Sequence, residues 1–163
     1  MDDLVQWLTA RLDTDEQIAR EATEGPWRNA PTARHHATAS GRSEEAVFGS
    51  PPDVGAMVVA VTGEAVERRN LVNAEFIAAH DPARVLREID AKRQLLGQYV
   101  SAAKSAEDLG AARDRLSAQG RDTLMTGLEL ESAIHRRDTL RGVLRLLAAP
   151  YSDRPGFREE WSP

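Results

Sequence analysis

The chain has 163 residues, with 26 acidic and 21 basic side chains, a formal net charge of −5 and no cysteine. The lack of cysteine excludes disulfides, thiolate catalysis and cysteine-based zinc sites. No stretch approaches the 18 apolar residues of a membrane span, no secretory signal is recognisable, and no strong basic stripe marks a duplex-binding protein. We therefore expect one domain over residues 1–163, a cytoplasmic location and no membrane partner, and the charge pattern disfavours nucleic acid as a partner.

Residues 1–24 are predicted to form an acidic, amphipathic helical region. They hold seven acidic and two basic side chains. Apolar residues recur at steps of three and four over 3–22, which is the period of a helix. Asp2 or Asp3 suits the N-cap, and Gly25-Pro26 ends the helix because proline cannot continue it.

Residues 25–63 are predicted to form a small β region. Val47-Phe48 and 57–61 are rich in β-branched and apolar residues, and turn-forming residues fill the stretch between them. The pattern indicates an antiparallel hairpin, or a three-stranded meander if Trp27-Arg28 adds a short strand. A lone hairpin is marginal in water, so we expect it to pack on a helix.

Residues 64–150 are predicted to be helical. A helix over 64–79 takes its apolar positions from side chains that include Val66 and Phe76. Asp81 and Pro82 then form a capped helix start. That helix is expected to run to Ala118, with Gly120 as its stop, and a last helix covers about 122–148 with Asp122 as its cap. The predicted fold class is thus α+β, mainly α, with a pair of long antiparallel helices.

The two long helices exceed what one small hairpin can cover. We therefore expect apolar surface to remain on them, and a homodimer through that surface is one open alternative.

The C-terminal segment 151–163 is predicted to be ordered. It holds three of the eight aromatic residues of the chain, Tyr151, Phe157 and Trp161, whereas disordered tails are aromatic-poor. Pro155-Gly156 can turn the segment back onto the helices. The alternative is a segment that binds a partner.

Catalytic signatures are absent from the sequence. His35-His36 lie in a polar stretch, and adjacent side chains point apart. His80-Asp81 resembles the metal-binding doublet of phosphohydrolases, but the further ligands of such a site have no supporting motif, so a capping Asp81 is favoured. No nucleophile elbow, dinucleotide fingerprint or P-loop is present. We predict no catalytic residue, metal or cofactor.

Three sequence anchors carry a family resemblance: Gly25-Pro26-Trp27, the stretch 73–93 and the tail from Tyr151 to Trp161. Together they resemble a family of small uncharacterised proteins of Streptomyces-type actinobacteria and their phages, and distantly the Ea22-like phage early proteins. The resemblance implies a cytoplasmic protein of phage or mobile-element type and assigns no catalytic residue. The candidate motif residues are Trp27, Phe76, His80, Asp81, Pro82, Arg84, Tyr151, Phe157 and Trp161.

Three interpretations of function remain open. The first is a non-catalytic interaction or accessory protein with an unidentified protein partner. The second is an enzyme or nucleotide-binding protein with a site near His80 and Asp81. Such a site would require at least three of five polar residues to converge in one pocket: His35, His36, His80, Asp81 and Arg84. The third is nucleic-acid binding.

Overall fold

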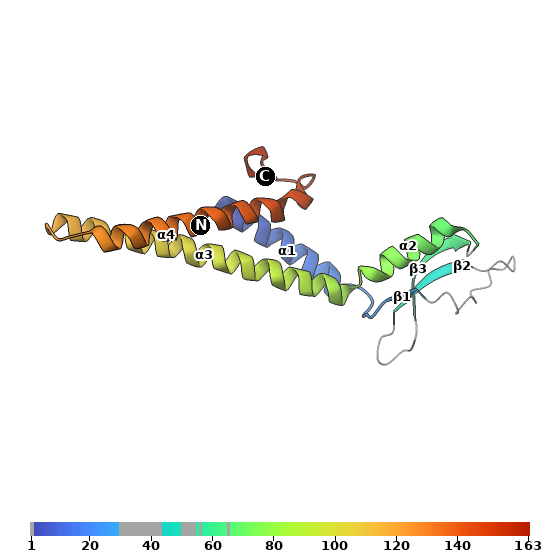
Figure 1. Ribbon diagram of the computed structural model, residues 1–163. Helices are drawn as coiled ribbons and strands as arrows, with labels where there is room; N and C mark the ends of the chain where they lie inside the picture. The colour runs from blue at the N-terminus through green and yellow to red at the C-terminus, as the bar shows by residue number, and fades with distance from the viewer. Residues whose placement is uncertain (1, 30–43, 50–54, 56, 65) are drawn as a thin grey trace. The chain divides into compact units, whose positions relative to one another are not determined.

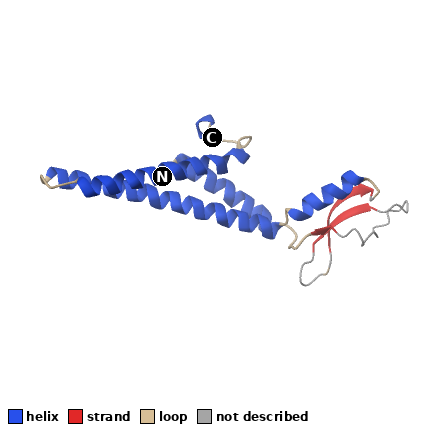
Figure 2. Ribbon diagram, in the orientation of Figure 1, coloured by secondary structure: helices blue, strands red, loops and turns tan. Residues whose placement is uncertain are grey.

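The computed structural model describes residues 2–29, 44–49, 55, 57–64 and 66–163. Figure 1 shows the elements, and Figure 2 shows that helix predominates over strand. This mainly helical α+β architecture confirms the predicted fold class. None of the helices in these stretches is both long enough and apolar enough to cross a bilayer. The elements are α1 (Asp3–Glu21), β1 (Arg28–Asn29), β2 (Glu44–Gly49), β3 (Met57–Glu64), α2 (Arg68–Ala79), α3 (Pro82–Ala118), α4 (Leu124–Ala148) and the 3-10 turns η1 (Ala149–Tyr151) and η2 (Glu159–Trp161).

The chain divides into two compact units. The first unit contains residues 1–12 and 90–163, and the second contains residues 13–89. Helices α1 and α3 contribute residues to both units. The expected single domain over residues 1–163 stays a prediction, and each unit is described by itself below.

The second unit contains a three-stranded antiparallel sheet in the order β1-β2-β3. The predicted hairpin is confirmed, and the third strand lies at Arg28–Asn29, one residue later than expected. The register shifts between Glu45 and Ala46, so that Thr62 is an extra residue on β3. Its hydroxyl donates to the Asn70 carbonyl oxygen at 2.8 Å. This contact ties α2 to the sheet, which supplies the helix that the hairpin needs.

Helix α2 differs from its prediction at Val66 and at Phe76. It begins at Arg68 rather than at residue 64, because β3 continues to Glu64, and Val66 precedes the helix with 87% of its surface exposed. Phe76 is 64% exposed, and Ala74 is the buried position. Two residues correspond to about 200° around a helix, so a helix that buries Ala74 turns Phe76 outward. The expectation of an inward Phe76 was therefore wrong.

The first unit is centred on the start of α1. The carboxylate of Asp2 accepts the backbone N–H of Leu4 at 3.0 Å, which confirms an aspartate as the N-cap. The same carboxylate accepts the Tyr99 hydroxyl at 2.7 Å and lies 3.5 Å from the Arg141 guanidinium. One side chain thus connects α1, α3 and α4. All three helices also bury leucines in this unit: Leu4, Leu8, Leu12, Leu96 and Leu144.

Residues 90–118 of α3 and helix α4 form the predicted antiparallel pair (Figure 1). The chain reverses at Gly120, whose φ of 67° lies in the left-handed region that favours glycine. Helix α4 begins at Leu124, two residues later than expected. Its first N–H donates to the Asp122 carboxylate at 2.8 Å, so Asp122 still serves the start of the helix.

The C-terminal tail packs back onto α1, as predicted. The Trp7 ring lies 5.3 Å from the Trp161 ring and 5.6 Å from the Phe157 ring, measured between centroids. Its indole N–H donates to the Pro155 carbonyl oxygen at 3.1 Å. Trp161 is 4% exposed, and a 2.9 Å ion pair joins Arg158 to Asp3 at the rim. The tail is therefore part of the packed first unit.

The Asp2–Tyr99 contact makes stability depend on pH at both extremes. Burial and the hydrogen bond to Asp2 raise the pKa of Tyr99 to about 12. Burial opposes ionisation of Asp2, but the hydrogen bond from Tyr99 and the nearby positive charge outweigh it and lower the pKa of that carboxyl. The contribution of Tyr99 to the free energy of unfolding is complete below the ordinary tyrosine pKa of about 10, and it is lost as the pH rises towards 12. The Asp2 contribution is complete above about pH 4 and is lost below it.

We expect Tyr99→Phe to remove the alkaline part of this dependence and to weaken the acid part. The measurement is the free energy of unfolding in urea, determined for both proteins between about pH 3 and 12. Equal losses for both proteins between about pH 10 and 12 would show that Tyr99 is not responsible.

Gly156 allows the tail to approach Trp7. Its φ is 83°, and a Cβ there would lie 3.1 Å from the Trp7 indole nitrogen. At Gly120 the φ is also positive, but a Cβ would meet nothing within 4 Å. Gly120→Ala should therefore lose about 1 kcal/mol of stability through its backbone alone. Gly156→Ala should lose more, because the ring must also move. Thermal unfolding measures the stability of both variants, and equal losses of stability in Gly120→Ala and Gly156→Ala would contradict the contact with Trp7.

Candidate functional site

A small apolar pocket lies in the second unit, between the end of α1 and the start of α3. Its volume is about 210 Å³. Two distant stretches of the chain, 15–27 and 80–85, form its wall, and three of the predicted candidates meet there. The lining residues are Asp15, Ile18, Ala19, Ala22, Trp27, His80, Pro82 and Val85.

The pocket depends on the break between α2 and α3. Helix α2 ends at Ala79, and the Asp81 carboxylate accepts the backbone N–H of Arg84 at 2.7 Å. This bond is the predicted N-cap, and it is confirmed. Pro82 occupies the first helical position, where a missing N–H leaves no bond unmade, and it is buried. The break turns His80 and Pro82 into the wall of the pocket.

Gly25 lets the chain pass close to this cap. A Cβ at that position would lie 3.0 Å from the Asp81 carboxylate. Trp27 follows two residues later, and its indole N–H donates to the Thr23 carbonyl oxygen at 2.7 Å. The Trp27 ring is half-buried and forms pocket wall. Its removal should therefore destabilise the protein by less than the roughly 3–5 kcal/mol expected for a fully buried ring.

Exposed apolar side chains lie at and beside the pocket. Ile18, in the wall, is 63% exposed, and Phe76 is 64% exposed. The Phe76 ring lies 4.3 Å from the His80 ring between centroids, and the Nδ1–H of His80 donates to the Phe76 carbonyl oxygen at 2.7 Å. The candidate Phe76 thus extends the apolar surface beyond His80, although it does not belong to the core.

The polar candidates serve the ends of helices. Asp81 caps α3, while Arg84 donates to the Ala79 carbonyl oxygen at 2.9 Å and to the Glu88 carboxylate at 2.8 Å. Of His80, Asp81 and Arg84, only His80 lines the pocket. His35 and His36 lie outside the described residues. In the part of the chain that the structure describes, no group of three or more His, Asp or Glu side chains is placed to hold a metal ion.

The aromatic candidates of the tail form a separate cluster in the first unit. Tyr151, Phe157 and Trp161 surround Trp7, with the Tyr151 ring 6.3 Å from it. Trp7, at the centre of this cluster, is not one of the candidates predicted from the sequence. Its position between Leu4 and Leu8 on one side of an amphipathic helix was the available signal, because residues three or four apart share a face.

The comparisons with known proteins identify a family. A family of unknown function, DUF6221, matches residues 1–163. The chain belongs to this family. No curated protein matches the chain, and no solved structure matches it. Membership in a family without assigned chemistry agrees with the resemblance described above, while the actinobacterial origin and the likeness to Ea22-like proteins stay predictions.

The cap at Asp81 gives a direct test of the pocket's framework. We expect Asp81→Ala to lower the free energy of unfolding by about 1 kcal/mol, because the Arg84 N–H loses its acceptor. Asp81→Asn is the matched control, since asparagine caps about as well as aspartate and should lose far less. Urea unfolding of the three proteins measures the difference. Equal losses in both variants would mean that the carboxylate acts by charge and not as a cap.

Proposed function

We propose that this DUF6221 protein is a non-catalytic interaction protein and that its pocket receives an apolar side chain of a protein partner. The observation that carries the proposal is the combination of an apolar wall with exposed Ile18 and Phe76. Exposed apolar surface around a concavity is characteristic of binding sites. The neighbouring polar groups of Asp81 and Arg84 are engaged in holding helix ends, which supports binding rather than catalysis.

The size of the pocket favours a side chain over a cofactor. Its volume of about 210 Å³ is below the roughly 300–1,000 Å³ of sites that enclose drug-sized ligands. A nucleotide would not be enclosed in it. A single leucine, methionine or aromatic side chain presented by a peptide suits this space.

The charge of the second unit indicates the rest of the partner segment. Residues 13–89 hold thirteen acidic and eight basic side chains, which accounts for the whole net charge of −5. Next to the pocket, residues 13–24 hold five acidic side chains and one basic side chain. Complementary charge increases the rate and specificity of association. The proposed segment therefore carries lysine or arginine beside its apolar residue, and the same acidic surface disfavours phosphate-rich nucleic acid.

The cellular setting belongs to the same proposal. The anchors 25–27 and 151–161 resemble proteins of phage or mobile-element type, and this resemblance supports an accessory role in a bacterial or phage-infected cell. A chain without cysteine suits a reducing cytoplasm.

A displayed library of random peptides, selected on the full-length protein, tests the proposal. We expect enriched peptides to share an apolar residue flanked by basic residues. Ile18→Arg should weaken their binding about tenfold or more, because it fills the rim of the pocket and repels the basic flanks. Arginine is a good helix former, so α1 should persist.

Leu146→Arg is the matched control, since Leu146 is 61% exposed on α4 in the first unit. It should leave peptide binding unchanged. Circular dichroism checks that both variants are folded. Selection without a shared apolar and basic pattern, or equal binding to wild type and Ile18→Arg, would contradict the proposal.

A further inference from the structure

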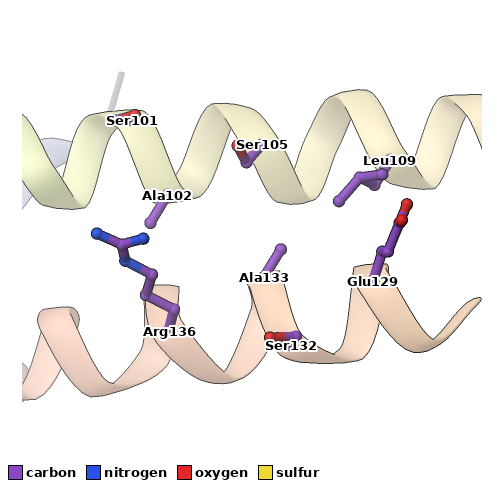
Figure 3. Close-up of a pocket in the computed structure, with 8 residues that line it drawn as sticks. All are labelled: Ser101, Ala102, Ser105, Leu109, Glu129, Ser132, Ala133 and Arg136. Atoms are coloured by element: carbon purple, nitrogen blue, oxygen red, sulfur yellow. The ribbon is translucent and has the colours of Figure 1, made fainter. Parts of the chain in front are cut away.

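A second concave surface lies in the first unit, independent of the pocket described above. It is a groove of about 310 Å³ between α3 and α4. Figure 3 shows the two helices side by side, each contributing four lining residues. Most of these side chains are serine or alanine, so the backbone of another helix can approach closely. The lining residues are Ser101, Ala102, Ser105, Leu109, Glu129, Ser132, Ala133 and Arg136.

The only charged side chains of this groove lie at its opposite ends. Figure 3 shows Arg136 near Ala102 and Glu129 near Leu109. The two α4 residues are seven positions apart, about two helical turns or roughly 10 Å. Within the described stretches neither forms an ion pair. The residues four positions away from them on α4 are uncharged: Met125, Ala133, Ser132 and Leu140.

The order of residues along α4 is complementary to itself. If a second α4 runs antiparallel and the twofold axis passes between residues 132 and 133, Glu129 of each copy faces Arg136 of the other. The same operation places Met125, which is 67% exposed, against the half-buried Leu140. Glu129 and Arg136 then each face a residue of opposite charge in the other copy, and the apolar residues Met125 and Leu140 face each other. A single shared surface of this kind is what a twofold homodimer requires.

The packing of the helical pair supplies a reason for a partner. Between residues 100 and 136, the buried apolar side chains are Ala102, Ala106 and Leu130, two of which are small. Leu124, Met125 and Leu128 remain more than half exposed on the same stretch of α4. Two helices alone bury a narrow seam, whereas four helices enclose a core.

We propose that two copies of this chain associate through this surface, which we call the α4 face: Met125, Glu129, Ser132, Ala133, Arg136 and Leu140. Each copy places its α4 in the groove of the other, forming a four-helix arrangement with two Glu129–Arg136 pairs. Residues 1–12 and 90–163 together hold thirteen acidic and thirteen basic side chains. Because this unit has no formal net charge, two copies do not repel each other through it.

Charge reversal at the two positions provides a sharp test. Glu129→Arg alone places two arginines opposite each other twice, and Arg136→Glu alone places two glutamates opposite each other twice. An equimolar mixture of the two single variants can form a heterodimer in which both pairs are again oppositely charged. Sedimentation velocity at micromolar concentration measures the mass of each sample against the 17.9 kDa of one chain. Circular dichroism confirms that each variant is helical.

We expect wild type to sediment with twice the mass of one chain. Each single variant should dimerise about tenfold more weakly, and the mixture should regain the dimer. Monomeric wild type would overturn the proposal, as would single variants that dimerise like wild type. Failure of the mixture to recover would equally overturn it, because the paired charges would then not face each other. None of these outcomes depends on the peptide pocket of the second unit.

Discussion

The capped break at Asp81-Pro82 is the constraint on which the second unit depends. One hydrogen bond from the Arg84 N–H to the Asp81 carboxylate determines where α3 begins. That start turns His80 and the buried Pro82 towards Ile18 and Trp27, whose side chains complete the pocket wall. A continuous helix through residues 70–95 would carry the same residues around its surface, and no concave apolar wall would form.

The two units present different surfaces because their charges are distributed differently. The second unit carries the whole net charge, and its pocket is apolar with an acidic surrounding. The first unit is neutral, and its groove has one acidic end and one basic end. An excess of one sign suits a partner of opposite charge, whereas a balanced pattern along one helix suits a second copy of itself. The two proposed associations therefore rest on different features of the two units.

Much of the fold followed from local sequence signals, and the errors have a common cause. The Asp2, Asp81 and Asp122 carboxylates accept backbone N–H groups two or three residues away at the starts of helices, so the sequence reveals them directly. The sequence predicts an inward Phe76 because apolar residues lie on more than one side of its helix, so the pattern does not fix which side is buried. The sheet selected the register that buries Ala74, and the contact between Thr62 and Asn70 that ties this helix to the sheet leaves no trace in periodicity.

By itself, the sequence determined the bounds of α1 and α3, the hairpin, the lack of cysteine chemistry and the aromatic character of the tail. Tertiary structure decided which side chains meet. The Tyr99 hydroxyl reaches an aspartate 97 residues away, and the Trp7 indole reaches a carbonyl 148 residues away. Propensities and caps act over a few residues, whereas these contacts form only when packing brings distant helices together. The pocket belongs to the same class, since its wall joins residues 15–27 to residues 80–85.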